Sequence, residues 1–373
     1  MKHCLSLLAG AALLACSTAH ASPARVQTGS FGEMTWTAAN TIVGQNSTAT
    51  AAAGGNPLYF AEMPKYNGVA YLVMDYGSAG SFVCSGTLLP SRAAILTAAH
   101  CVSNGMPDRP LSTTVHFYTG NNPDTIVSSA PTFSYQVSHY NVHEKYTGDV
   151  IDQNDIAILR LSQFVDSSVK SYDLYTADLT GVDYNVAGYG GRSTVGGATG
   201  VNAGTGRLRQ GDNRYDYRLG DADFGGIWSP ILGQPAEQIA YTYLADFDNG
   251  TADNDANCLV ATDGIGLAAS AKYCDTGRGA TEVSTAGGDS GGPQFVDGKI
   301  ASVTSFGLTF GPGFGDVDKV RGPNSSFGEL NGFVPVSIHE DFIRKNSVPE
   351  PVSLALVGTA LLAGGFARRS KKA

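Results

Sequence analysis

One stretch of the sequence, residues 287–293, could carry out covalent chemistry, because Ser290 follows an aspartate there and lies between two pairs of glycines. A serine hydroxyl is a weak nucleophile and needs a neighbouring base to remove its proton before it attacks a carbonyl carbon. The attack creates an oxyanion, which backbone N–H groups stabilise when they point at it. Glycines permit such a tight turn because they adopt positive φ angles and carry no side chain. The stretch therefore predicts a reactive serine, provided that another part of the chain supplies the base.

His100 is the candidate base, and Asp155 is the candidate residue that orients it. Histidine accepts a proton near neutral pH and can return it to a leaving group. Asp155 begins a mostly apolar stretch, 155–161, where a carboxylate could accept a hydrogen bond from the imidazole and hold the useful tautomer. Taken singly, a histidine after an apolar strand and an aspartate at a strand start are usually structural. The interpretation therefore depends on all three residues together.

Three blocks of the sequence, 96–101, 154–161 and 288–293, resemble the active-site blocks of the trypsin/chymotrypsin family of serine proteases and occur in its order of His, Asp and Ser. The resemblance covers about residues 59–346. It implies an all-β fold of two six-stranded antiparallel β-barrels with a short C-terminal helix and the site between the barrels. It also implies that His100, Asp155 and Ser290 are catalytic and that the N–H groups of Gly288 and Ser290 form the oxyanion hole.

The spacing of Gly288, Ser290 and Gly292 also fits the nucleophile turn of α/β-hydrolases. Those enzymes carry their catalytic residues in the order Ser, Asp or Glu, and His. Only His339 follows Ser290 in this chain, within a predicted terminal helix, so the order of residues argues against an esterase on that fold.

The family resemblance also implies residues for substrate binding. Ser284, six residues before Ser290, would form the base of the primary pocket, and Ser305 would belong to the strand that pairs with the substrate backbone. Gly307 and Gly332 would form the pocket walls, which predicts an open pocket for large apolar side chains. Ala286 stands where the family has a cysteine, so the bridge beside this pocket is missing.

The resemblance identifies Asp289 as the aspartate that pairs with a newly cut N-terminus. Ile42, in the sequence Ile42-Val43-Gly44, has the character of that N-terminus. It lies further from Cys84 than in compact family members, and Asn40-Thr41 is not a tryptic cut site. Either Ile42 is the new N-terminus, or the start lies elsewhere.

Four of the six cysteines remain after a predicted export signal is removed, and an even number in an exported protein indicates disulfides. Four cysteines allow three connectivities, of which the local pairs Cys84–Cys101 and Cys258–Cys274 are the simplest. A bridge from Cys84 to Cys101 would clamp the strand end that carries His100. A zinc site is the competing interpretation, but neither pair has C-x-x-C spacing.

Two other groups of residues have the types that bind metals. His139 and His143 lie four residues apart, although 143–146 resembles an ordinary loop of the family. A cluster of oxygen-bearing residues around Gly250 suits Ca²⁺ and consists of Asp246, Asp248, Asn249, Asp253, Asn254 and Asp255. The candidate ion would lie near Asp246, Asp248 and Asp253. The spacing is not that of an EF-hand, and such stretches are commonly solvated turns. The predicted reaction itself requires no cofactor.

Short β-strands separated by turn residues must position these side chains. The strands are expected at 69–74, 81–89, 93–97, 114–118, 134–137, 156–161, 184–190, 293–296, 299–306 and 333–337, followed by a helix at 338–346. The two barrels would span about 59–175 and about 182–346. The glycine-rich polar segment 191–257 has no predicted role.

Both ends of the chain resemble targeting segments. Residues 1–21 have the charged start, apolar run and small-residue cleavage site of an export signal, although 13–16 could instead be a lipoprotein site. Residues 22–58 show no sustained period and are predicted to be a linker or pro-segment. Residues 347–373 resemble the PEP-CTERM sorting signal of Gram-negative bacteria, with Val-Pro-Glu-Pro, an apolar run at 352–367 and a basic end. This implies recognition by an exosortase, transient membrane association through the apolar helix, and a place at the cell surface or in the extracellular matrix.

The whole sequence thus predicts a secreted, monomeric serine endopeptidase of the trypsin/chymotrypsin type that acts on polypeptides. A formal net charge of −9 and the lack of a basic stripe argue against nucleic acid as a partner. The alternative is a catalytically inactive matrix or adhesion protein built on the same scaffold. Labelling of Ser290 by a fluorophosphonate would separate the two.

Overall fold

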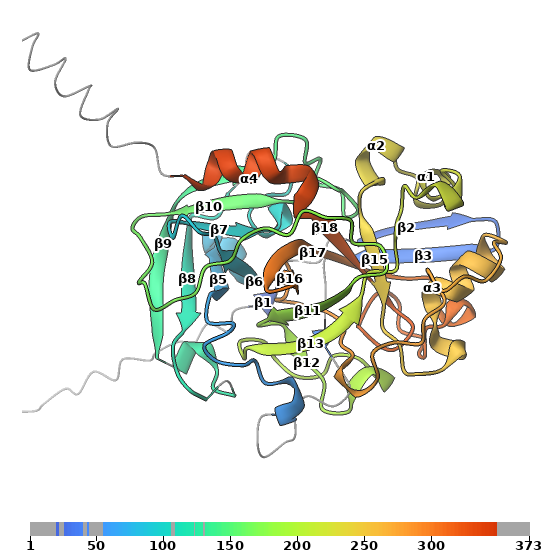
Figure 1. Ribbon diagram of the computed structural model, residues 1–373, viewed down its shortest axis with the longest axis horizontal. Helices are drawn as coiled ribbons and strands as arrows, with labels where there is room; N and C mark the ends of the chain where they lie inside the picture. Colours follow the sequence, from blue (N-terminus) through green and yellow to red (C-terminus); the bar gives the residue numbers. More distant parts are fainter. Residues whose placement is uncertain are drawn as a thin grey trace, which may run out of the picture.

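A computed structural model describes residues 20–21, 26–39, 43–44, 55–105, 109–122, 124–129 and 131–348 of the 373-residue chain (Figure 1). Most of the export signal, Ile42 and the whole apolar run 352–367 lie outside the described residues. Within the described part of the chain, no helix is both long and apolar enough to cross a bilayer.

The first half of the fold is a closed barrel of six antiparallel strands. They pair in the order β6 (Ser81–Leu88), β5 (Val69–Asp75), β8 (Ser112–Tyr118), β9 (Thr132–Val142), β10 (Ala157–Leu161) and β7 (Ala94–Thr97). A further pairing of β7 with β6 closes the ring. The short strand β1 (His20–Ala21) adds to β6 in parallel. Apolar side chains of these strands form one buried cluster, and β5, β6, β7 and β10 are buried along most of their length and not only at every second position.

The second half is a curled antiparallel sheet. Its strands follow the order β13 (Arg209–Arg214), β11 (Asp183–Gly188), β16 (Pro293–Val296), β17 (Lys299–Thr309), β18 (Leu330–Pro335), β15 (Tyr243–Asp246) and β14 (Tyr217–Arg218). Only Tyr215 and Asp216 separate β13 from β14 along the chain, so one bent segment pairs with β11 at one end of the sheet and with β15 at the other. The predicted all-β architecture is thereby confirmed, with the first barrel closed and the second a curled half-barrel.

Part of the segment 22–58, which is predicted to be a linker or pro-segment, forms regular secondary structure. Strands β2 (Val26–Phe31) and β3 (Met34–Ala39) form an antiparallel hairpin, and β3 pairs with the end of β17. Trp36 of β3 is buried, and its indole N–H donates to the carbonyl of Ile231 at 2.8 Å. Alternating Thr and Ala residues gave little indication of this strand, because neither type reveals which face is buried. Strand β4 (Val43–Gly44) pairs in parallel with β12 (Gly191–Arg192).

The helices are short and lie around the sheets. Helices α1 (Trp228–Leu232) and α2 (Ala236–Ile239) lie beside the hairpin in Figure 1, α3 (Ala256–Leu259) follows β15, and α4 (Glu340–Ser347) covers β10 and β7. The glycine-rich segment after residue 191 thus builds part of the second sheet and a cluster around Trp228 that packs on β3. Single 3₁₀ turns lie at Pro57–Tyr59, Gly77–Ala79, Ala99–Cys101, Val127–Ser129, Gly196–Ala198, Ala222–Phe224, Ala252–Asn254, Gly279–Thr281, Pro312–Phe314 and Val336–His339, and a π turn lies at Val260–Gly264.

Candidate active site

The pairing of two strands brings His100 and Asp155 together. Strand β7 ends three residues before His100, and Asp155 precedes β10, which pairs with β7 so that Ala157 lies opposite Thr97. The two flanking residues therefore meet beyond the ends of the strands. His100 Nδ1 lies 2.7 Å from Asp155 Oδ2, and the backbone N–H of His100 donates to Asp155 Oδ1 at 2.8 Å. Both residues are buried, so water does not compete for these hydrogen bonds.

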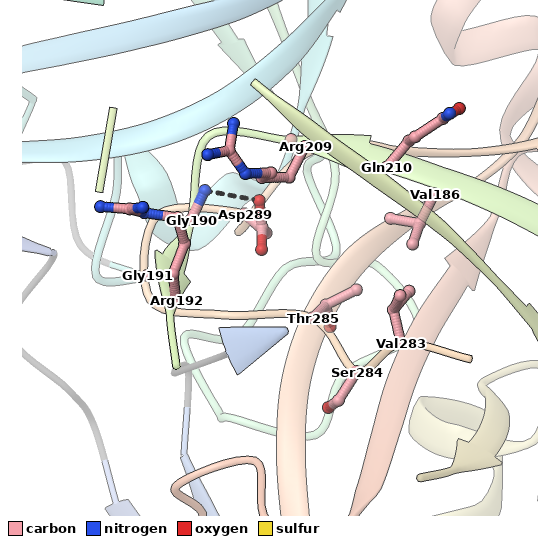
Figure 2. A pocket seen from close by; sticks show the side chains of 11 residues that line it. Val186, Gly190, Gly191, Arg192, Arg209, Gln210, Val283, Ser284, Thr285 and Asp289 are labelled. Carbon is pink, nitrogen blue, oxygen red and sulfur yellow. Dashed lines mark hydrogen bonds between the residues drawn. The ribbon is translucent and has the colours of Figure 1, made fainter. Parts of the chain in front are cut away.

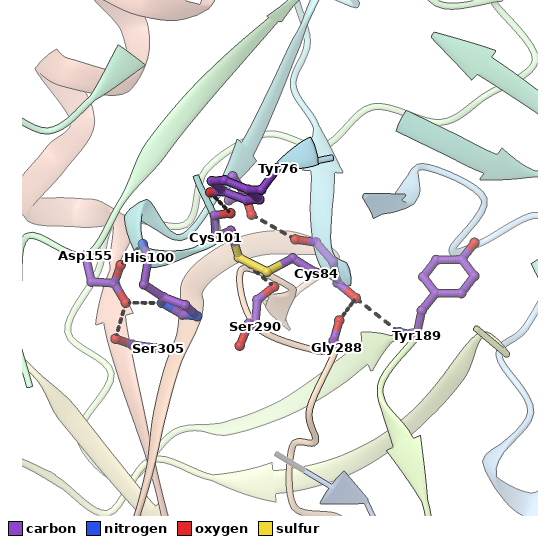
Figure 3. The surroundings of a disulfide bond; sticks show 11 residues. Tyr76, Cys84, His100, Cys101, Asp155, Tyr189, Gly288, Ser290 and Ser305 are labelled. Carbon is purple, nitrogen blue, oxygen red and sulfur yellow. Dashed lines mark hydrogen bonds and ion pairs between the residues drawn. A yellow bond between two sulfur atoms is a disulfide. The ribbon is translucent and has the colours of Figure 1, made fainter. Parts of the chain in front are cut away.

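Ser305 is the third residue at this carboxylate. Its hydroxyl donates to Asp155 Oδ2 at 2.6 Å from β17 of the second sheet. The sequence predicts Ser305 only as part of the strand that pairs with substrate, so its side-chain contact with Asp155 was missed. Three donors from the two halves of the fold now fix the orientation of Asp155 (Figure 3).

The loop that carries Ser290 packs against the end of β7. The carbonyl of Ser290 accepts the N–H of Ser85 at 2.9 Å, and Gly291 donates to Thr304 at 2.9 Å. Gly291 has φ 77°, and a Cβ there would lie 2.0 Å from Thr97 Oγ1, so only glycine allows this approach. Figure 3 draws the imidazole of His100 between Asp155 and Ser290. His100 Nε2, the nitrogen not bonded to Asp155, is buried and has no hydrogen-bond partner in the described part of the chain.

Gly288 lies in the same turn with φ 109°, which favours glycine. Its carbonyl accepts the hydroxyl of Ser85 at 2.8 Å, and this hydroxyl in turn accepts the N–H of Tyr189 at 3.1 Å. Within the described residues, the N–H groups of Gly288 and Ser290 donate to no acceptor of the protein. They are therefore available to a ligand.

Both predicted disulfides are confirmed. Cys84 of β6 forms a disulfide with Cys101, next to His100, and their Cα atoms lie 6.2 Å apart. Cys258 of α3 forms the second disulfide with Cys274, and their Cα atoms lie 4.5 Å apart. Cys101 Sγ also lies 3.5 Å from the carbonyl of Ser290 (Figure 3). The first bridge thus anchors the turn that carries His100 beside the serine loop.

Asp289 points away from this cluster into a small cavity (Figure 2). Its Oδ1 accepts the N–H of Gly190 at 2.7 Å and its Oδ2 accepts the N–H of Ala286 at 2.8 Å. No basic side chain of the described residues forms an ion pair with it, and burial of the carboxylate raises the pKa of Asp289 to about 7. The backbone of Val43 pairs with Gly191, which adjoins Gly190, so the chain just after Ile42 runs beside this cavity.

The predicted substrate pocket is not open in this structure. Gly332 lies beneath the buried ring of Phe306, and a Cβ at Gly332 would lie 2.2 Å from Phe306 Cζ. Ser284 donates to Asn331 Oδ1 at 3.0 Å and lines the same cavity as Asp289. In this conformation the phenyl ring of Phe306 fills the space beside Gly332, so the open pocket between glycine walls stays a prediction. Sequence reasoning missed both Phe306 and Asn331, since each looks like an ordinary strand residue.

Gly307 does have a β-strand partner, but that partner belongs to the chain itself. Ala39 of β3 lies opposite Gly307, followed by Ala38 opposite Leu308. The edge of β17 that the resemblance assigns to substrate is thus occupied by the N-terminal hairpin.

The acidic segment is divided by the fold. Asp246 and Asp248 are buried and lie close to Asp255, whereas Asp253 lies on an exposed turn. Of the predicted cluster, Asp246, Asp248 and Asp255 therefore lie together, because the cap of α3 turns Asp255 inward, whereas Asp253 faces solvent. His143 packs against His339 and Phe342, with ring centroids 4.6 and 4.9 Å apart, in agreement with a structural role.

Comparisons with known proteins were made for sequence and for fold. The chain is similar to a solved structure described as HL collagenase, with 18% identity over 78% of this chain and 96% of that chain and a TM-score of 0.48. It is similar to neuropsin, a serine protease expressed in the limbic system of mouse brain, with 18% identity, 77% and 97% coverage and a TM-score of 0.47. No curated protein matches the chain.

The family model described as Trypsin matches residues 61–213. This range contains His100 and Asp155 together with their strands β7 and β10, and it ends before Ser290. The match covers less than half of the chain, and over this range the chain is similar to the trypsin family.

Proposed function

We propose that the protein is an exported serine endopeptidase in which His100, Asp155 and Ser290 are catalytic. The observation that carries the proposal is the buried 2.7 Å hydrogen bond between His100 Nδ1 and Asp155 Oδ2, beside a serine loop and with Nε2 unpartnered. An imidazole held at Nδ1 by a carboxylate presents Nε2 as the base. No other described arrangement of serine, histidine and aspartate in this chain has this support.

The reaction would proceed through an acyl-enzyme. Ser290 Oγ attacks the peptide carbonyl carbon as its proton passes to His100 Nε2, and Asp155 stabilises the imidazolium that forms. The N–H groups of Gly288 and Ser290 stabilise the oxyanion, and such a donor typically contributes about 10²–10³ in rate. His100 then gives its proton to the leaving amine. A water molecule, deprotonated by the same imidazole, hydrolyses the acyl-enzyme.

The proposed P1 preference is for large apolar side chains. Ser284 carries no charge to attract Lys or Arg, and Gly307 and Gly332 leave the walls without side chains. Substrate entry then requires the ring of Phe306 to leave its position over Gly332. A digest of a peptide library measures this preference, and dominant cleavage after Lys or Arg would contradict our assignment of Ser284.

We further propose that the uncut chain is latent. The hairpin spans both halves of the fold, since Gln27 Oε1 accepts the N–H of Val150 at 2.9 Å and Ala39 pairs with Gly307. A substrate strand cannot pair with β17 while β3 occupies its edge. Cleavage just before Ile42 would free the hairpin and create an α-amino group two residues from Gly44. That ammonium would compensate the buried carboxylate of Asp289, which has no ion-pair partner among the described residues.

The proposed location is the surface or extracellular matrix of a Gram-negative bacterium. It rests on the export signal in 1–21 and on the PEP-CTERM-like segment 347–373, which an exosortase would process. Mass spectrometry of the mature protein determines its first and last residues. Retention of residues 352–373 in the released protein would contradict processing by an exosortase.

A cleavable chain tests catalysis and latency separately. An enteropeptidase recognition sequence is inserted immediately before Ile42, and a fluorophosphonate probe is applied before and after the cut. We expect slow labelling before the cut and stoichiometric labelling of Ser290 after it, and no labelling of Ser290→Ala. Folded protein that stays unlabelled in both states would exclude the proposed enzyme and favour a matrix or adhesion role. Equal labelling in both states would exclude only latency.

A further inference from the structure

Five carboxylic acids are buried together between the second sheet and α3. Asp216 lies in the bend between β13 and β14, Asp246 ends β15, and Asp248 follows two residues later. Asp255 caps α3, and Glu282 precedes the serine loop. All five are less than 9% exposed. Burial of a charge is costly unless it is paired, so such a group requires compensation from somewhere.

Neutral hydrogen-bond donors satisfy most of these groups. Asn257 serves two of them, because its N–H donates to Asp246 Oδ2 at 2.7 Å and its Nδ2 donates to Asp216 Oδ2 at 2.6 Å. Asp255 Oδ1 accepts the N–H of Cys258 at 3.0 Å. Glu282 Oε1 accepts the N–H of Asp248 at 3.0 Å.

Asp248 is the exception. It is 6% exposed, and its Oδ1 is buried without any hydrogen-bond partner in the described part of the chain. A carboxylate oxygen of Asp248 lies within 4.8 Å of carboxylate oxygens of both Asp246 and Asp255. A buried carboxylate that has an unpartnered oxygen and lies beside two other carboxylates is the arrangement expected around a cation.

No basic side chain of the described residues forms an ion pair with any of the five acids. The guanidinium groups of Arg214 and Arg278 both bind Asp275 instead. Burial, followed by the charges of the neighbouring acids, raises the pKa of Asp248 far above its usual range and that of Asp255 to about 8. Without a cation, these two carboxyl groups would therefore keep their protons at neutral pH, because no basic side chain of the described residues compensates their charge.

We propose that Asp246, Asp248 and Asp255 bind one Ca²⁺ ion. Ca²⁺ takes six to eight oxygen ligands at roughly 2.3–2.6 Å, so ligand oxygens around it lie up to about 5 Å apart, as they do here. The donor set consists of oxygen atoms alone, since the nearby Cys258 and Cys274 sulfurs are joined in a disulfide. Mg²⁺ demands near-ideal octahedral geometry and usually retains several waters, which a cluster of three converging carboxylates suits less well. The ion would tie the end of β15 to the cap of α3.

Wild-type full-length protein tests the site without any variant. The protein is stripped with a chelator and titrated with CaCl2 in a calorimeter, and its melting temperature is measured with and without CaCl2. We expect one Ca²⁺ per chain and a rise in melting temperature of several degrees. Tb³⁺ provides an independent readout, because the buried ring of Tyr217 lies near Asp216, Asp246 and Asp255 and should sensitise its luminescence.

Two isosteric variants locate the ion. Asp248→Asn removes a proposed ligand, and Asp253→Asn removes the same charge from the exposed turn nearby. We expect Asp248→Asn to weaken Ca²⁺ binding at least ten-fold and to be no less stable than wild type in chelator, because it relieves repulsion. Asp253→Asn should bind as wild type does. A wild-type protein that shows neither binding heat nor a thermal shift would overturn the proposal, as would equal losses in both variants. Bound protons alone would then neutralise the buried carboxyl groups.

Discussion

At the scale of single residues, Asp155 joins the two halves of the fold. It accepts hydrogen bonds from His100 beyond β7 and from Ser305 of β17, so a displacement of either sheet would change the position of the imidazole. A small shift of a catalytic group can reduce the rate substantially, because the reacting atoms must be nearly aligned. The correct spacing of the two sheets is therefore a requirement of the proposed chemistry.

Gly332 offers a test of the Phe306 contact at the same scale. A Cβ at this position would lie 2.2 Å from Phe306 Cζ, and the ring is fully buried and cannot retreat into solvent. We expect Gly332→Ala to lower the free energy of unfolding by about 1–3 kcal/mol, as overpacked cores do.

Gly313→Ala is the matched control, because no atom lies within 4 Å of a Cβ built there. Neither glycine has a positive φ, so only the available space differs between them. Urea unfolding of both variants measures the effect. Equal stability of the two would mean that the phenyl ring does not fill the predicted pocket in solution.

At the scale of elements, Trp36 is the largest side chain that the hairpin β2–β3 buries. Trp36 packs among Trp228, Ile231 and their neighbours and donates to the carbonyl of Ile231. Truncation of a buried tryptophan costs about 3–5 kcal/mol, which exceeds what a two-stranded hairpin can offset by its own pairing. We therefore expect Trp36→Ala to release β3 from β17, so that fluorophosphonate labelling of the uncut chain becomes faster.

The control for this prediction is Val26→Ala in the same hairpin, because Val26 is 59% exposed and should leave the labelling rate unchanged. Limited proteolysis within 26–39 provides a second measure of release. If proteolysis shows that the hairpin has left while labelling of Ser290 stays slow, β3 does not cause the latency.

The strands of the first barrel could be predicted well, but the hairpin could not. The predicted strands 69–74 and 81–89 correspond to β5 and β6. Both segments contain apolar residues such as Val, Leu and Phe, and turn residues separate them from their neighbours. Residues 34–39 contain two alanines and two threonines, a pattern typical of many loops. Their strand exists because β17 offers a free edge and because Trp36 finds a buried site formed by α1, neither of which is local in sequence.

At the candidate site, too, contacts that are not local in sequence could not be predicted. Three short blocks were sufficient to select His100, Asp155 and Ser290, and the cysteine count with local pairing was sufficient for both disulfides. The sequence placed Asp255 in the same acidic cluster as Asp248 but did not reveal which of these acids are buried together, since the direction of Asp255 depends on the first turn of α3. The position of Phe306 over Gly332 depends on packing between β17 and β18, which residue types alone do not reveal.

At the scale of the whole molecule, the buried acids determine how stability depends on pH. Burial raises the pKa of Asp216 to about 7, of Glu282 to about 8 and of Asp289 to about 7 in the folded state. The unfolded chain releases these protons near pH 4, so the folded state binds more protons between about pH 4 and pH 8. Stability is therefore greatest at the acidic end of this range and decreases as pH rises through the folded pKa values.

One histidine acts in the opposite direction. Burial lowers the pKa of His339 to about 4, which favours folding as pH rises toward 6.5, but the raised acids outnumber it. In the presence of a chelator, we expect the free energy of unfolding to decrease by roughly a few kcal/mol between pH 5 and pH 8. Urea unfolding at several pH values measures the slope. A stability that stays constant or increases over this range would show that the acids are already compensated without added cation.

The covering of β17 by a strand of the same chain has a consequence for when hydrolysis can begin. A tethered strand acts at an effective concentration on the order of millimolar, whatever the concentration of the protein. Dilution therefore cannot dissociate β3 in the way that it would dissociate a separate inhibitor. A substrate must compete with a neighbour that never diffuses away, and one break in the backbone ends that competition permanently.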